Sequence, residues 1–191
     1  EFKKTYSGII VEINAVNVDG RGTITAISGG VNWDFTALEK ITFPSTVTNI
    51  FAGSSRGFVF ADNPKLATFG PTGTEVGTLD LSGITVAWSE WGWEERLAFM
   101  NTAFKKVILP SNVPSAIGID RMFTNCKALE EVIIPATVGS ISPNSFSGCT
   151  ALKILHIYGT LNIDSTAFND CPAVKVYNYG GGTLSKLPTG S

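Results

Sequence analysis

Charged residues are scarce in this chain and nearly balanced in sign. Of its 191 residues, 14 are Lys or Arg and 16 are Asp or Glu, which gives a formal net charge of −2. A protein that binds nucleic acid needs a basic surface, so nucleic acid is not an expected partner. No stretch approaches the roughly 18 consecutive apolar residues of a membrane-spanning helix, so no membrane insertion is predicted for this segment.

Residues that carry catalytic or metal chemistry are also few. The chain has one His and three Cys, and it contains no phosphate-binding loop, paired catalytic carboxylates or Ser-His-Asp arrangement. Zinc ligands usually occur as paired C-x-x-C or H-x-x-x-H, and neither spacing is present. We therefore predict no enzymatic activity, no cofactor and no metal site. The odd number of cysteines argues against a disulfide framework.

What the chain does contain is one repeated pattern. Three clear copies start at Phe123, Phe146 and Phe168, and each places Cys three residues later, followed by Ala, an apolar residue and a short apolar strand. Aligned on that apolar residue, which we call the Leu position, the copies include Leu38, Phe104, Leu129, Leu152 and Val174, the last four separated by 25, 23 and 22 residues. Self-similarity at this period is typical of a solenoid, whose repeats bury their apolar side chains only by stacking.

Each copy predicts one short strand with a buried face. The side chains three and five residues after the Leu position are apolar, and this period of two places them on one side of a strand. The pairs are Val107/Leu109, Val132/Ile134, Leu155/Ile157 and Tyr177/Tyr179. Pro110 and Pro135 end their strands, because proline cannot donate to a ladder. Strands of successive coils are expected to stack in parallel, about 4.8 Å apart.

The repeat does not cover the ends of the chain. We predict a single domain over 1–191, in which 35–179 form about six coils and 180–191 form a C-terminal tail. Residues 1–34 do not fit the pattern. Their two apolar stretches flank a turn at Asn17–Gly22, which predicts a β-hairpin-like cap over the exposed end of the core.

Residues 67–98 form an irregular unit. Both Leu66 and Val76 fit the start of a strand, and the register between them stays open. Residues 84–98 are longer than other returns and form an insertion rich in tryptophan, with room for a short helix near Ser89.

The pattern F-x-x-C-x-A-L-x-x-V-x-I-P-x-x-V resembles the BspA-like leucine-rich repeats, best over 99–179 and again over 35–69. The resemblance implies a right-handed coil of the leucine-rich-repeat type, with one parallel β-sheet and short irregular or 3-10 returns. It also implies surface proteins of bacteria or protists, some linked to adhesion to host matrix proteins. One column departs from the commonest repeat, because the position eight after the Leu position is not regularly Asn or Cys, so no asparagine ladder is expected.

The tryptophan-rich insertion is the first candidate binding site. Trp88, Trp91 and Trp93 lie within six residues and fit either a stacking platform for a sugar ring or an anchor for a protein partner. The alternative is that the insertion packs its aromatics on the coils beneath it, which we favour for most of the cluster because Trp is highly buried on average. Trp91, beside Gly92, is expected to be the most exposed.

Outward strand positions are the second candidate. Ile108, Ile133 and Ile154 are expected to be exposed and nearly contiguous, as on a contact surface, unless another segment covers them. The outward positions of the last strand are expected to be Val176 and Asn178. His156 also points outward, which predicts an isolated surface histidine able to act as a weak pH sensor.

The three cysteines share one inward column. Stacked free thiols that pack as small hydrophobic groups are preferred there over a metal site. The column holds Cys126, Cys149 and Cys171, and Asn63 takes the matching place before Leu66.

We therefore predict a non-catalytic binding or adhesion module that recognises protein partners through the strands and the Trp-bearing insertion. The alternatives are a glycan-binding module that uses Trp88, Trp91 and Trp93, or a purely structural spacer. Low charge and many Thr, Ser, Asn and Gly residues favour an extracellular or cell-surface location.

Overall fold

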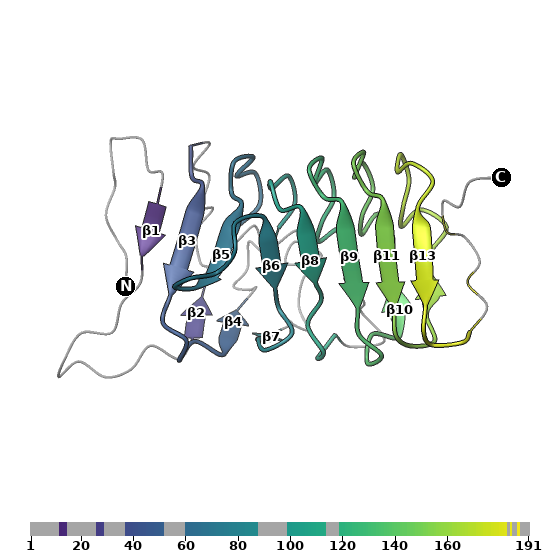
Figure 1. Cartoon of the computed structure of the whole chain (residues 1–191), viewed down its shortest axis with the longest axis horizontal. Helices are drawn as coiled ribbons and strands as arrows, with labels where there is room; N and C mark the ends of the chain where they lie inside the picture. Colours follow the sequence, from purple (N-terminus) through teal and green to yellow (C-terminus); the bar gives the residue numbers. More distant parts are fainter. Residues whose placement is uncertain are drawn as a thin grey trace.

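The structure is a computed structural model that describes residues 12–14, 26–28, 37–51, 60–87, 99–113, 119–182, 184 and 187. The coils stack side by side along the long axis of the molecule (Figure 1). The described residues contain strands β1 to β13 and no helix, and every paired strand runs parallel to its neighbour. The predicted parallel β-solenoid is confirmed.

The largest sheet has five strands, in the order β13-β11-β9-β8-β6. These strands span Thr78–Asp80 (β6), Lys106–Ile108 (β8), Glu131–Ile134 (β9), Ile154–Ile157 (β11) and Lys175–Asn178 (β13). Buried and outward residues alternate along β9 and β11, as the period of two predicted. Val107, Val132 and Leu155 occupy equivalent positions and are fully buried.

The prediction of one continuous sheet is wrong, because the sheet is divided within a single coil. Three further strands, β1 (Glu12–Asn14), β3 (Lys40–Phe43) and β5 (Thr68–Pro71), form a separate sheet in the order β1-β3-β5. Figure 1 shows β5 and β6 joined by a link that returns to the start of β6. Strand β5 pairs with β3 of the preceding coil, whereas β6 pairs with β8 of the following coil.

The divided coil answers the question of register that the sequence left open. Leu66 and Val76 both precede a strand at the expected distance, so both assignments are correct. Only Leu66 is buried, however, and Val76 is 75% exposed. Leu66 fills the position in the hydrophobic core that this coil provides. Val76, which precedes the second strand of the same coil, therefore has no position in the core and stays exposed.

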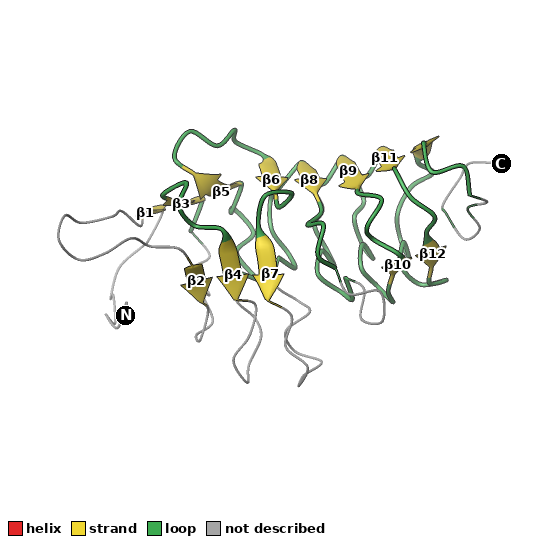
Figure 2. Cartoon of the chain, turned by 90° about the horizontal axis from the view of Figure 1, so that it is seen from below, coloured by secondary structure: helices red, strands yellow, loops and turns green. Residues whose placement is uncertain are grey.

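The opposite wall of the solenoid also contains short strands (Figure 2). Strands β2 (Ala26–Ser28), β4 (Asn49–Phe51) and β7 (Thr85–Ala87) form one sheet, and β10 (Ser140–Ile141) pairs with β12 (Asn162–Ile163). The returns therefore combine turns with parallel strands, and the described residues contain no 3-10 segment.

The predicted N-terminal hairpin does not form. β1 and β2 lie in different sheets, where β1 pairs in parallel with β3 and β2 pairs in parallel with β4. The two strands therefore continue the stacking of the coils. The local turn signal was outweighed by the longer-range pairing of each strand with its equivalent in the next coil.

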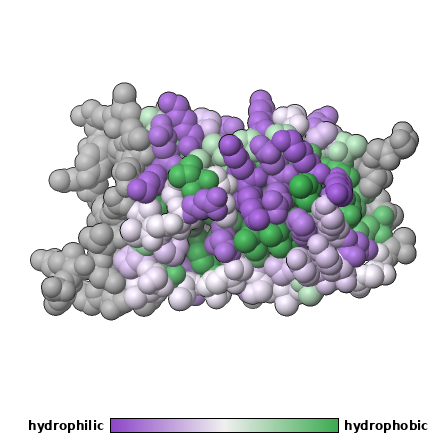
Figure 3. All heavy atoms as spheres, in the orientation of Figure 1, coloured by the Kyte–Doolittle hydropathy of each residue, from purple (hydrophilic) through white to green (hydrophobic). Residues whose placement is uncertain are grey.

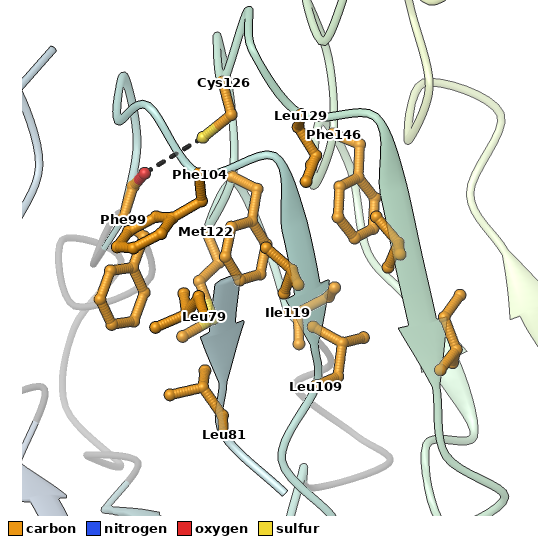
Figure 4. Close-up of a cluster of buried hydrophobic side chains, with 14 of the residues drawn as sticks. Leu79, Leu81, Phe99, Phe104, Leu109, Ile119, Met122, Cys126, Leu129 and Phe146 are labelled. Atoms are coloured by element: carbon orange, nitrogen blue, oxygen red, sulfur yellow. Dashed lines mark hydrogen bonds between the residues drawn. The ribbon is translucent and has the colours of Figure 1, made fainter. Parts of the chain in front are cut away.

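A column of phenylalanines runs through the core. Phe99, Phe123, Phe146 and Phe168 stack face to face, with neighbouring ring centroids 5.2–6.0 Å apart and interplanar angles of 5–10°. Figure 4 shows two of these rings, Phe99 and Phe146, among the surrounding leucines. Equivalent residues of successive coils face one another, so a repeated Phe gives a continuous ladder of aromatic contacts.

The residue two places after each of these phenylalanines, and after Phe60, adopts a left-handed backbone conformation. The φ angles lie between 54° and 60° at Asp62, Asn101, Asn125 and Asp170, and the same place is taken by Gly148. Asn, Asp and Gly adopt left-handed backbone angles more readily than other residues. This preference explains why Asn, Asp or Gly directly precedes each position of the cysteine column.

Candidate interaction surface

The outer face of the five-stranded sheet carries the predicted contact residues in two rows. The strand register defines the first row as Thr78, Lys106, Glu131, Ile154 and Lys175. The second row is Asp80, Ile108, Ile133, His156 and Tyr177. Figure 3 shows hydrophilic side chains over the middle of this face, with smaller hydrophobic areas beside and below them.

The last strand is shifted by one residue from the predicted register. Val176 pairs with Leu155 and packs against the core, and Tyr177 pairs with the outward His156. The segment between the Cys column and the inward strand residue is one residue shorter in this coil than in the two before it. The predicted inward Tyr177 and outward Val176 are therefore exchanged, and an additional aromatic ring reaches the outer face.

This shift completes a group of four aromatic side chains, His156, Tyr158, Tyr177 and Tyr179, which we call the aromatic patch. His156 stacks on Tyr177 with centroids 4.9 Å apart, and Tyr158 stacks on Tyr179 at 4.6 Å. The Tyr179 hydroxyl also lies 3.5 Å from His156 Nδ1, which links the two stacks. Tyr158 and Tyr179 are 47% and 57% exposed, so the patch faces solvent.

Glycine allows the backbones beneath the tyrosines to approach closely. A Cβ atom at Gly159 would lie 2.6 Å from the carbonyl oxygen of Ala136 in the preceding coil. A Cβ at Gly180 would likewise contact the carbonyl oxygen of Gly159. Each glycine directly follows one of the two stacked tyrosines, so close backbone contact and ring stacking occur side by side.

Charged groups surround the aromatic patch. Glu131 Oε1 lies 3.0 Å from Lys106 Nζ and 3.5 Å from His156 Nε2. Lys175 Nζ lies 4.7 Å from the centre of the Tyr177 ring, a cation–π contact, and no carboxylate of the described residues contacts this ammonium group.

A second ion pair lies on the turn beside this face. Lys153 Nζ lies 2.7 Å from Glu130 Oε2. The hydrogen bond from Lys153, together with its charge, lowers the pKa of the Glu130 carboxyl.

The predicted isoleucine surface is only partly present. Ile108 and Ile133 are directly opposite each other, but Ile154 lies in the other row, opposite Glu131. All three point outward, as predicted, but they are half-buried by their neighbours. The exposed apolar surface of this sheet is the aromatic patch instead.

His156 points outward as predicted but is not isolated. It contacts the Tyr177 ring, the Tyr179 hydroxyl and the Glu131 carboxylate. Trp88, Trp91 and Trp93 lie outside the described residues, together with the helix expected near Ser89.

Sequence reasoning missed Tyr158, Tyr177, Tyr179 and Lys175 as surface residues. One signal was present, because Tyr158 takes the place of the strand-ending Pro135 in the next copy of the repeat. In the last copy the sequence pattern puts Gly180 at this place, and only the shifted register of β13 brings Tyr179 there. A change from a strand terminator to an exposed aromatic, repeated in adjacent coils, distinguishes this end of the face.

The thiol column forms hydrogen bonds between coils. The Sγ atoms of Cys126, Cys149 and Cys171 donate to the carbonyl oxygens of Phe99, Phe123 and Phe146 in the preceding coil, at 3.1–3.2 Å (Figure 4 shows the first). All three thiols are free, as predicted, and Cys126 and Cys149 are fully buried.

The described residues contain no group of three His, Cys, Asp or Glu side chains placed to hold a metal ion. A groove of about 460 Å³ lies where the sheet divides, but two of its polar groups serve local turns. Thr74 Oγ1 donates to the Pro71 carbonyl, and Asp80 accepts from the Ser82 amide. None of the described segments is a helix long and apolar enough to cross a membrane.

Comparison with known proteins agrees with the repeat pattern. Residues 95–187 match the model of the BspA type leucine rich repeat region, in six copies. No curated protein gives a significant sequence match.

Two solved structures resemble the chain. A leucine-rich repeat protein from Bacteroides ovatus ATCC 8483 aligns over 94% of this chain with 20% identity and a TM-score of 0.51. The alignment covers 50% of that protein, so the chain spans half of its length. A leucine rich repeat protein of T. pallidum aligns over 75% of this chain and 68% of its own, with 19% identity and a TM-score of 0.42. At this level of identity, the likeness to the Bacteroides ovatus protein shows the fold alone.

Proposed function

Because residues 95–187 match the BspA type leucine rich repeat region, we propose that this chain is a non-catalytic module that binds a protein partner through the outer face of the five-stranded sheet. Leucine-rich repeats are generally protein-interaction modules, and solenoids present extended surfaces suited to this task. The aromatic patch is the principal anchor of the interaction.

The exposure of two stacked tyrosines is the observation that carries the proposal. Tyr158 and Tyr179 are 47% and 57% exposed, although the phenylalanines of the same coils are buried. Tyrosine is enriched at interface positions that contribute most to binding, because it combines a large apolar ring with a polar hydroxyl.

The charges beside the patch favour a partner of particular chemistry. Lys106 forms an ion pair with Glu131 within the sheet, whereas the Lys175 ammonium group lies over the Tyr177 ring and pairs with no carboxylate of the described residues. A partner segment with an Asp or Glu next to an apolar or aromatic side chain satisfies both features. The charge pair steers association, and burial of the aromatic rings supplies most of the affinity.

We further propose an extracellular or cell-surface location and a role in adhesion, with host matrix or another surface protein as the partner. BspA-type repeats occur often in secreted and cell-surface proteins, and the low charge and many small polar residues of this chain agree with that setting. Trp88, Trp91 and Trp93 are proposed to extend the contact surface.

Glycan binding and a spacer role are the alternatives. Sugars stack on open ring faces, and Tyr158 and Tyr179 cover each other on one face. The glycan alternative therefore depends on the three tryptophans of the insertion. A structural spacer needs no exposed aromatic surface, so the aromatic patch favours a binding role over a spacer role.

A binding screen with matched variants tests the proposal. The chain is passed over immobilised collagen, fibronectin and laminin, and over a glycan array, as wild type and as Y158A/Y179A, K175A and W91A. Loss of a central interface aromatic typically costs at least about 2 kcal/mol, which is about a 30-fold loss of affinity. We expect that loss for Y158A/Y179A and a smaller loss for K175A.

The control is Val76→Ser, which removes a strongly exposed apolar side chain of the divided coil, away from the aromatic patch. It should leave binding unchanged. Protein binding that survives Y158A/Y179A contradicts the assignment of the patch, and binding to glycans alone that is lost in W91A supports the glycan alternative.

A further inference from the structure

The thiol column ends in a half-buried cysteine with a neighbour directly behind it. Cys149 is fully buried, whereas the side chain of Cys171 is partly open to solvent. The two coils are held together here by a backbone hydrogen bond of 2.8 Å from Gly148 to the Asn169 carbonyl. Both thiols point into the same column, and each donates to the coil before it.

The spacing of the coils suits a covalent bond between these two cysteines. Hydrogen-bonded parallel segments lie about 4.8 Å apart, and the Cα atoms of disulfide-bonded cysteines are usually about 4.4–6.8 Å apart. The Phe146 carbonyl oxygen accepts from both residues, from the Cys149 amide and from the Cys171 thiol, each at 3.1 Å, which places the Cys171 sulfur beside Cys149. A disulfide between them would link two coils that a backbone hydrogen bond already holds side by side.

The two thiols differ in exposure in a way that assigns their roles. Cys171 is the one thiol of the column that is not fully buried, and Cys149 lies buried in the coil before it. A peroxide in solvent therefore reaches the Cys171 sulfur first, and the thiolate of that sulfur is the reactive species.

We infer that Cys171 and Cys149 form a peroxide-reactive pair, in which Cys171 is the reacting thiol and Cys149 the resolving thiol. The Cys171 thiolate attacks one oxygen of a peroxide, the O–O bond breaks, and with one proton the products are a sulfenic acid and water. Cys149 then attacks the Cys171 sulfur, and its proton leaves with the hydroxyl as a second water. One peroxide is reduced, and two thiols are oxidised to one disulfide.

Cys126 is excluded from this pair by its surroundings. It is 1% exposed, and it lies against the Thr102 hydroxyl as well as the Phe99 carbonyl. Burial raises the pKa of its thiol. Cys126 is therefore an unreactive thiol of the same column, with which the reaction of Cys171 can be compared.

Treatment of the folded chain with hydrogen peroxide tests the inference. Thiol titration after denaturation should fall from three free thiols to one, intact mass should drop by two hydrogens, and peptide mapping should show a Cys149–Cys171 link that dithiothreitol reverses. Cys171 should react about tenfold faster than Cys126. In Cys149→Ala, a dimedone adduct should accumulate on Cys171, and Cys126→Ala should still form the disulfide.

Four results overturn the inference: no reaction of Cys171 in the folded wild type, a disulfide that includes Cys126, a link between two chains, or sulfinic acid at Cys171 without a disulfide. The wild-type mapping decides the matter even where an alanine variant folds poorly. Because no binding partner is involved, failure of this test leaves the proposed function untouched.

Discussion

The two parts of the solenoid build similar coils from different side-chain contacts. In residues 99–182, which we call the regular stack, the phenylalanine rings of the core column lie parallel, with interplanar angles of 5–10°, and Phe104 meets Phe99 of this column edge to face. In residues 37–87, the N-terminal part, Phe43 and Phe60 meet Phe69 edge to face, at 72° and 62°. Identical residues in register give a ladder, whereas the divided coil brings phenylalanines from different columns together.

The thiol column shows the same contrast. In the regular stack each cysteine donates to the preceding coil, so its hydrogen bond joins two repeats. Asn63, in the matching place of the N-terminal part, donates instead to Phe60 and Ala61 of its own coil. Thr102, at the junction, also bonds within its own coil, to the Phe99 carbonyl. The column therefore joins coils in one part and shapes a turn in the other.

This difference predicts that the two parts respond separately to large core deletions. Phe123→Ala removes a ring that stacks on both neighbours, and deletion of a buried Phe costs about 3–5 kcal/mol. Phe43→Ala is the matched deletion in the N-terminal part. Because each coil contacts mainly its neighbours, hydrogen exchange should show lost protection in β8, β9 and β11 for Phe123→Ala, and in β3 and β5 for Phe43→Ala.

Urea unfolding gives the size of each effect, and exchange gives its location. If Phe43→Ala lowers protection in β11 and β13 as much as in β3, the two parts unfold as one unit and the comparison does not hold.

Close backbone packing provides a second, smaller test. Gly159→Ala adds a methyl group against the Ala136 backbone, which cannot move aside as a side chain can, so we expect a loss of about 1–3 kcal/mol in the free energy of unfolding. Gly83→Ala, in the N-terminal part, meets nothing within 4 Å and should change stability by less than about 0.5 kcal/mol. Equal losses in urea unfolding would mean that the regular stack is not the more tightly packed part.

The repeated columns could be predicted from the sequence because each is written several times. Phe146, Cys149 and Leu152 are buried as expected, since the spacing and the apolar character of these positions agree in the three clear copies. The order of strands followed from the same agreement, because equivalent segments of stacked coils pair with each other.

The features that occur once could not be predicted. A shift of one residue exchanges the two faces of a strand, and Val174–Tyr177 contains apolar side chains on both faces, so the pattern did not fix the register of β13. The divided coil was hidden for a related reason. Leu66 and Val76 both match the start of a strand, and only the pairing partners show that one coil contains both strands.

The smallest expected effect concerns the different role of one column in the two parts. Asn63→Cys replaces an amide that donates to two carbonyls of its own turn with a single weak thiol donor, so one buried carbonyl loses a hydrogen bond. We expect a loss of about 1 kcal/mol in urea unfolding. Thr102→Cys is the control, because it replaces one hydroxyl donor with one thiol donor and extends the cysteine column toward the junction. Its loss of stability should be smaller. If Asn63→Cys is as stable as the wild type, the column accepts a thiol in both parts, and the contrast in hydrogen bonding has no energetic consequence.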